Sequence, residues 1–208
     1  MIIRSFPVGP IQTNCYVIGC SETHAGAVID PGWDAPAILS EAESAGLAIE
    51  LVLNTHAHWD HVSANADVLE ATGARLAIHN NDLPLLRARG GADLWQIPVR
   101  PSPEPDILLT DGQLLQVGQL QLRVLFTPGH SPGHVSFYEA GAGVVFDGDV
   151  LFRQGIGRSD LPGGDHQRLM QSIHTVLMGL PPETIVYSGH GPPTTIGEER
   201  QSNPWLRS

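Results

Sequence analysis

The sequence predicts an α/β protein in which two β-sheets are covered by helices, or a mixed α/β layer structure. Three observations predict it. Short apolar runs recur along the 208 residues, and turn residues separate them. Longer stretches repeat their apolar residues with the helical period and lie between those runs. The order of strands, helix, strand, helix, more strands, helix and a last strand suits sheets packed under helices. Because a domain averages about 150 residues, we expect one domain over residues 1–208.

The first half of the chain opens with strands and then alternates strands with helices. Turn residues such as Pro7 and Gly19 break the early apolar runs. The first helix carries its apolar residues on one face and stops at Gly46, and the second stops at Gly73. The expected strands are residues 2–6, 15–18, 25–29, 49–53 and 74–78, and the expected helices are residues 35–45, 62–72 and 84–89.

Residues 98–106 contain four prolines and therefore predict an extended connection. Strands resume at Leu108 and are separated by tight turns. Asp165 is placed to cap a helix that ends at Gly179. The expected strands of this half are residues 114–117, 120–126, 135–138, 144–146 and 184–187.

The composition excludes several classes of function. Eleven basic and 22 acidic residues give a net charge of −11, and no basic cluster occurs. Binding of nucleic acid needs a face of lysine and arginine, so we expect no nucleic-acid partner. An acidic surface also repels anionic membranes, and no apolar run is long enough to span a bilayer. The first residues lack the pattern of a leader peptide, so a cytoplasmic protein is expected.

A cluster of histidines gives the strongest functional signal. His56, His58, Asp60 and His61 follow a buried strand and precede a helix, where α/β proteins place their sites. Imidazole and carboxylate groups are ligands for zinc, iron and manganese. Residues two apart in a tight loop can converge on one ion. We therefore expect His56 and His58 at a first metal, and Asp60 and His61 at a second.

Three later residues can complete the coordination. His130, Asp149 and His190 each come just after a predicted strand and beside glycines, which allow backbone and ligand to approach closely. Asp147 competes with Asp149 for one role, and its place after Gly148 favours Asp149. We expect His134 and Asp147 to support the site or the core without binding metal.

These segments together resemble the metallo-β-lactamase superfamily, over essentially the whole chain. The resemblance rests on residues 56–61, on residues 127–134, on Gly148-Asp149 and on residues 189–191. It implies a four-layer αββα sandwich with two metals at one edge. Within the superfamily, the chain is most similar to the glyoxalase II branch, the hydroxyacylglutathione hydrolases, on residues 157–160, 191–200 and 203–204. The likeness is to short bacterial members that lack the C-terminal helical domain.

The resemblance also implies a dinuclear centre and a set of ligands. Zinc is the expected metal, with iron or manganese as alternatives, because the same donors accept all three. An aspartate at position 149 in place of cysteine counts against a secreted β-lactamase. Carried over, His56, His58 and His130 would bind the first metal, Asp60, His61 and His190 the second, and Asp149 both.

The implied activity is cleavage of a thioester of the S-lactoylglutathione type to a hydroxy acid and a thiol. A metal-bridging water with its pKa lowered toward neutrality would attack the carbonyl, and Asp60 would also orient this nucleophile. The family uses a lysine and a tyrosine where this chain has Arg158-Ser159-Asp160. Arg158 keeps the positive charge and is a candidate to pair with a substrate carboxylate. The alternative is an ordinary surface arginine.

Three other functions stay open. A persulfide dioxygenase of the same superfamily shares the first histidine loop and uses one Fe²⁺ held by two histidines and an aspartate. A lactonase would need an apolar acyl pocket. A non-catalytic binding module would be expected to lose one or more ligands, whereas all seven are present. The oligomeric state stays open as well.

Overall fold

The first of two large sheets is built from the N-terminal half of the chain. The computed structural model describes residues 1–207, and the strand order of this sheet is β1-β2-β3-β4-β5-β6. The pairs β1–β2 and β2–β3 are antiparallel, and the pairs from β3 to β6 are parallel. The strands are β1 (Ile2–Val8), β2 (Thr13–Gly19), β3 (Ala25–Ile29), β4 (Ala48–Leu53), β5 (Arg75–His79) and β6 (Ile107–Leu109).

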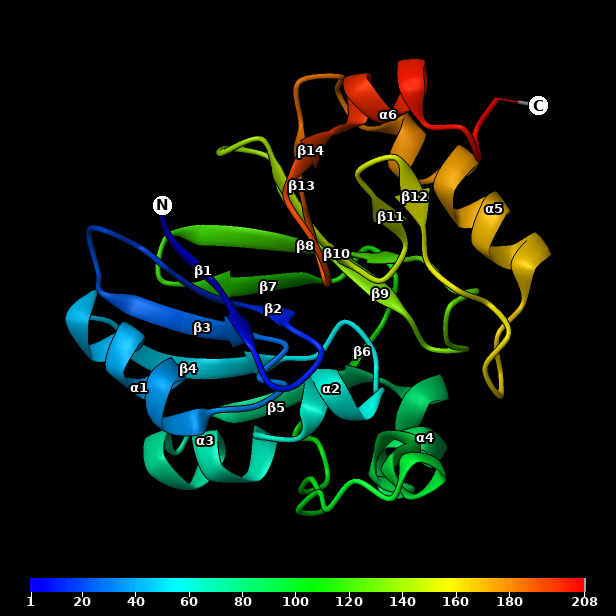
Figure 1. Cartoon of the computed structure of the whole chain (residues 1–208). Helices are drawn as coiled ribbons and strands as arrows, with labels where there is room; N and C mark the ends of the chain where they lie inside the picture. The colour runs from blue at the N-terminus through cyan, green and yellow to red at the C-terminus, as the bar shows by residue number, and fades with distance from the viewer. Residues whose placement is uncertain (208) are drawn as a thin grey trace.

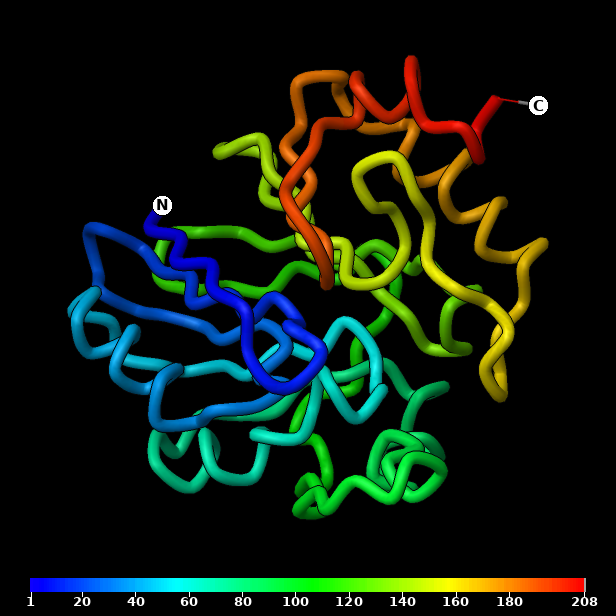
Figure 2. The backbone as a smooth tube through the Cα atoms, viewed as in Figure 1, coloured from blue at the N-terminus to red at the C-terminus, as the bar shows by residue number. Residues whose placement is uncertain are grey.

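The second large sheet follows in the C-terminal half, with the order β14-β13-β10-β9-β8-β7. Only β10 and β13 run parallel in it. Figure 2 shows the chain pass from the first sheet, in blue to green, into the second, in green to red. The strands are β7 (Leu114–Val117), β8 (Leu120–Phe126), β9 (Val135–Glu139), β10 (Val144–Gly148), β13 (Ile185–Ser188) and β14 (Thr194–Thr195). A small hairpin pairs β11 (Leu151–Phe152) with β12 (Gly155–Ile156).

Helices cover the outer face of each sheet and leave the inner faces packed together (Figure 1). On the first sheet lie α1 (Ala35–Ser44) and α3 (Asn65–Thr72). On the second lie α5 (His166–Thr175) and α6 (Ile196–Ser202). The expectation of a four-layer αββα sandwich is therefore confirmed.

The central strands read as continuous apolar runs because both of their faces are buried. In β2, Ile18 packs into the core between the sheets, whereas its neighbour Val17 packs under α1 and α3. In β3 the neighbours Ile29 and Val28 divide in the same way. A third core joins the second sheet to α5 and α6 through residues such as Leu169.

Two helices differ from the expectation by more than one or two residues. The helix expected over residues 62–72 is divided into α2 (Trp59–Val62) and α3. The break places Asn65 at the start of α3, where its buried side chain donates to Asn54 Oδ1 at 2.7 Å. The helix capped by Asp165 ends at Thr175 and not at Gly179, because Val176 turns the chain into the 3₁₀ turn η3 (Leu177–Gly179).

Short elements complete the chain. After β5 come η1 (Asn80–Asp82), α4 (Leu83–Arg87) and η2 (Arg89–Trp95). Residues 98–106 contain no helix or strand, as their prolines predict. No helix within residues 1–207 has the length and apolar character needed to cross a membrane.

Candidate metal centre

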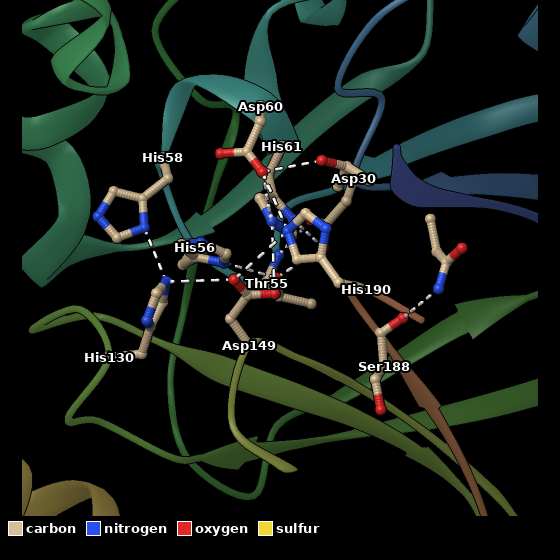
Figure 3. A network of polar contacts seen from close by, with 12 residues as sticks. Asp30, Thr55, His56, His58, Asp60, His61, His130, Asp149, Ser188 and His190 are labelled. Carbon is tan, nitrogen blue, oxygen red and sulfur yellow. Dashed lines mark hydrogen bonds and ion pairs between the residues drawn. The ribbon is translucent and has the colours of Figure 1, made fainter. Parts of the chain in front are cut away.

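The predicted ligands meet at one edge of the sandwich (Figure 3). His56 and His58 follow β4, and α2 adds Asp60 and His61. His130, Asp149 and His190 follow the ends of β8, β10 and β13. Parallel strands end at the same edge of a sheet, which is where α/β folds bind ligands. The structure therefore brings all seven residues from both sheets into one cluster.

Two groups of donors lie within this cluster. The ligand atoms of His56, His58 and His130 all lie within 4.8 Å of one another, and so do those of Asp60, His61 and His190. In the first group, His58 Nδ1 is 2.8 Å from His130 Nε2. In the second, Asp60 Oδ2 is 3.2 Å from Nε2 of both histidines.

Asp149 lies between the two groups. Its Oδ2 is 3.5 Å from His130 Nε2 and 3.6 Å from His190 Nε2. Its Oδ1 is 3.5 Å from His61 Nε2. One carboxylate therefore lies near both groups, with Oδ2 between His130 and His190 and Oδ1 beside His61.

The cluster contains buried polar atoms that have no hydrogen-bond partner and that a cation would satisfy. His56 Nε2, His61 Nε2 and Asp149 Oδ1 are buried and have no hydrogen-bond partner. Buried polar atoms in proteins almost always have one, so three such atoms at one place need an explanation. Nitrogen and oxygen donors of these types bind zinc, iron and manganese. The residues present thus fit a metal site.

Asp30 fixes the proton positions of two histidines. Its carboxylate accepts from the Thr55 amide at 2.8 Å and from Thr55 Oγ1 at 2.6 Å. Since the Thr55 hydroxyl donates to Asp30, it accepts from His56 Nδ1 at 3.0 Å. His61 Nδ1 donates to Asp30 directly, also at 3.0 Å. Both rings therefore direct Nε2 into the cluster, as carboxylate–histidine–metal arrangements require.

His130 is oriented by a backbone carbonyl. Its Nδ1 donates to the Arg158 carbonyl oxygen at 2.7 Å, so Nε2 carries the lone pair that faces the cluster. The Arg158 side chain is half exposed and makes a two-pronged ion pair with Asp160, at 2.7 and 2.8 Å. The group expected to meet a substrate carboxylate is thus already paired with a carboxylate of the chain.

The pKa values of the cluster separate two kinds of histidine. Burial, helped by the neighbouring histidines, lowers the pKa of His56 well below its ordinary value and that of His58 to about 3. Burial also acts on His61, but the carboxylates of Asp60, Asp149 and Asp30 raise its pKa well above the ordinary value. His61 and His190 in turn hold the pKa of Asp60 low against the effect of burial. His56 and His58 are therefore neutral and ready to bind a cation, whereas Asp60, His61 and His190 form a charge-balanced network.

Asp82 joins the loops that carry the first group. It accepts from the Ala57 amide at 2.9 Å, from Ser131 Oγ at 2.7 Å and from the Gly133 amide at 2.5 Å. One buried carboxylate thus ties the histidine loop of the first sheet to the loop of His130.

The loop of His190 is held from β2. Asn14 donates to the carbonyl oxygens of Ser188 and Gly191, at 2.9 and 2.8 Å. Thr13 Oγ1 donates to Asp60 Oδ2 at 2.8 Å. Sequence reasoning missed these residues, Asp30 and Asp82 as parts of the site. Only Asp30 carried a signal, because it follows β3 beside the strand that leads to the histidines.

His134 and Asp147 lie beside the cluster and outside its donor groups. The His134 ring stacks on His56 at 5.0 Å, and its Nε2 accepts from the Asp149 amide at 3.1 Å. Asp147 is buried and accepts from the Leu151 amide at 2.9 Å. His134 therefore positions Asp149, and Asp147 fixes the turn between itself and Leu151.

A cavity of about 580 Å³ opens above the cluster. Five of the seven predicted ligands line it, and Arg158 lies at its rim. The ligands at the cavity are His58, Asp60, His130, Asp149 and His190. The cluster is therefore accessible to a small molecule.

Solved structures of similar proteins share this fold. A structure titled BLEG-1 B3 metallo-beta-lactamase has 41% identity, covers 100% of both chains and gives a TM-score of 0.94. TTHA1623 in a di-iron-bound form has 41% identity over 98% of this chain and 100% of that one, with a TM-score of 0.90. ETHE1 from Myxococcus xanthus has 30% identity over 99% and 84% of the two chains, with a TM-score of 0.83.

Curated relatives and the family comparison agree with the structures. The probable metallo-hydrolase YqgX of Bacillus subtilis is 41% identical over 98% of this chain and 96% of its own length. The hydroxyacylglutathione hydrolase GloC of Haemophilus influenzae is 37% identical over 100% and 99%. The family model described as Metallo-beta-lactamase superfamily matches residues 8–190. With the fold and the cluster of histidines and aspartates, this match shows that the chain belongs to the metallo-β-lactamase superfamily.

Proposed function

We propose that the chain is a dinuclear metallohydrolase that cleaves thioesters of the S-lactoylglutathione type. The observation that carries the proposal is the cluster of seven donors, five of which line an open cavity. The similarity to GloC, a hydroxyacylglutathione hydrolase, supports the class of substrate.

In this proposal each residue has a defined role. His56, His58 and His130 would hold the first metal, Asp60, His61 and His190 would hold the second, and Asp149 would contribute to both. Zinc is the first candidate, and the di-iron form of TTHA1623 supports iron equally. When bound, such metals polarise a carbonyl and lower the pKa of water.

The chemical step is hydrolysis. Water adds to the thioester carbonyl carbon, the C–S bond breaks, and a proton from the water ends on the released thiol. The products are a carboxylic acid and a thiol. Asp60 lines the cavity and can accept a hydrogen bond from the attacking water, which orients it. A thiolate leaves readily, so the site needs no strong acid on the leaving side.

A persulfide dioxygenase is the second candidate, since it shares the first histidine loop. The second donor group favours the hydrolase, because a mononuclear iron site of two histidines and one aspartate does not need His61 and His190. Oxygen consumption with glutathione persulfide separates the two activities. A lactonase of the same fold stays open and is assayed with an acyl lactone.

The test is hydrolysis of S-lactoylglutathione by purified protein whose metal content is measured. We expect rapid turnover with about two metals per chain. His58→Ala and Asp149→Asn should each abolish turnover and lower the metal content. His174→Ala is the matched control, because His174 is exposed on α5.

Three outcomes contradict the proposal. Full activity in either ligand variant excludes this cluster as the reaction centre. Oxygen consumption by a protein with a single iron assigns the dioxygenase instead. Cleavage of a cephalosporin with no cleavage of any thioester would align the chain with the activity named for BLEG-1.

A further inference from the structure

We propose that an apolar wall of the cavity binds the acyl group of the substrate, so that thioesters with apolar acyl chains are preferred over small hydroxyacyl ones. The inference rests on the proposed thioester hydrolysis and adds the class of acyl group to it. We call the side chains that carry it the acyl wall. They are Ile11, Leu85, Leu94, Trp95 and Leu161, all at the cavity of the metal cluster.

The acyl wall leaves much of its apolar surface uncovered. Ile11 is 50% exposed, Leu94 68% and Trp95 55%. Seven large apolar side chains are exposed among the described residues, and these three gather at this one cavity. Scattered apolar residues on a surface are ordinary, but a group of them beside a reactive centre is typical of a ligand site.

The acyl wall is fixed next to the candidate ligands by close packing. Gly90 is the second residue of the turn η2 and has φ +65. A Cβ at this position would lie 2.2 Å from the Trp59 amide nitrogen. The Trp59 ring packs against Ala92 of the same turn. Since Trp59 begins the helix that carries Asp60, the turn holding Leu94 and Trp95 is seated directly on the ligand segment.

The charges around the cavity favour an uncharged group. The chain has no lysine, and its eleven basic residues are all arginines. Of these, only Arg158 lines the cavity in the described structure, and Asp160 neutralises it. Apart from the candidate ligands, the other charged residue of the lining is Asp93, which forms an ion pair with Arg89. Both Arg158 and Asp93 are thus already paired within the chain, and the acyl wall offers apolar surface to an uncharged group.

The experiment compares thioesters of one thiol whose acyl group lengthens from acetyl through butyryl to hexanoyl, with S-lactoylglutathione beside them. Full burial of a methylene is worth about fourfold in binding, and a half-open wall gives about half of that free energy, or about twofold. We therefore expect kcat/KM to rise about 16-fold over the four methylenes from S-acetylglutathione to S-hexanoylglutathione.

Matched variants locate the effect. Leu94→Ser and Trp95→Ser together should reduce the hexanoyl-to-acetyl ratio from about 16-fold to about fourfold, since two of the exposed anchors are gone. Both positions are exposed, so the fold is retained, and circular dichroism checks this. Leu114→Ser and Trp205→Ser are the controls, because both residues are equally exposed, at 55% and 56%, and lie outside the cavity lining. They should leave the ratio unchanged.

The outcomes separate this inference from the proposed function. A flat acyl series with rapid cleavage of S-lactoylglutathione overturns the acyl wall and leaves the hydrolase. No cleavage of any thioester by metal-loaded protein overturns both. A wild-type dimer that Trp95→Ser converts to a monomer, with the acyl series unchanged, shows that a second copy covers the wall and also overturns the inference.

Discussion

Removing the Asp82 carboxylate should loosen the centre without touching a ligand. Asp82→Ala leaves three buried donors without a partner, namely the Ala57 amide, the Ser131 hydroxyl and the Gly133 amide. At about 1 kcal/mol for each lost hydrogen bond, the free energy of unfolding should fall by about 3 kcal/mol. In a chain of this length that corresponds to a fall in Tm of about 6–12 °C.

The assay is urea denaturation of metal-free protein followed by circular dichroism, so that metal binding does not enter the comparison. Ser131→Ala is the control, because it removes one of the three bonds and should cost about 1 kcal/mol. Metal affinity of Asp82→Ala, measured separately, should fall by about 10–100-fold, since the loops of His56 and His130 lose their tie. A loss for Asp82→Ala no larger than that for Ser131→Ala would refute the reasoning.

The same carboxylate predicts the sign of a pH effect. Burial raises the pKa of Asp82 above its ordinary value, although hydrogen bonds from Ser131, Ala57 and Gly133 oppose the shift. The folded state therefore holds the proton more tightly than the unfolded state, and this contribution to stability is lost as the pH rises through the folded pKa. Asp82→Asn cannot titrate. The free energy of unfolding of wild type minus that of Asp82→Asn should thus decrease as the pH increases. An increase in this difference would show that the hydrogen bonds outweigh burial.

Two further predictions concern positions outside the ligand set. Gly32→Ala should prevent soluble folding, because a Cβ there would lie 1.6 Å from the Asp60 carbonyl oxygen, whereas Gly73→Ala, with φ +69 and open space, should cost only about 1 kcal/mol in urea denaturation. Asn14→Ala removes two hydrogen bonds to the carbonyls that flank His190. The affinity for one of the two bound metals should fall by about tenfold in a metal titration. An equal loss of affinity for both metals would contradict the assignment of His190 to a separate group.

The strands could be predicted from the sequence because burial on both faces leaves an unbroken apolar run. Ala25–Ile29 has the bounds that such a run predicts, and Leu120–Phe126 has its expected bounds although exposed Gln121 and Arg123 interrupt its apolar residues. The cluster was also predictable as a set, since each member comes just after a strand and the ends of neighbouring strands meet at one edge. Local patterns sufficed for both.

Contacts between segments that are distant in the chain could not be predicted from the sequence. Asp82 and Ser131 are 49 positions apart, and no local pattern around either residue predicts the hydrogen bond between them. The helix α6 has few apolar residues and no clear period. It depends instead on the Thr195 cap and on buried Glu199, which bonds Thr194 and Asn203. The bond between Asp82 and Ser131 forms only once the two halves of the chain have packed together.

The candidate donors are divided between the two layers, with four from the half of the chain before β7 and three from the half after it. Each donor group takes residues from both halves, so an ion held by either group would cross-link the two sheets. Like a disulfide, such a link restricts how far the two layers can separate, and unlike one it can be removed by a chelator. Amide hydrogen exchange at the inner faces of both sheets should therefore report metal loading, far from the ligands themselves.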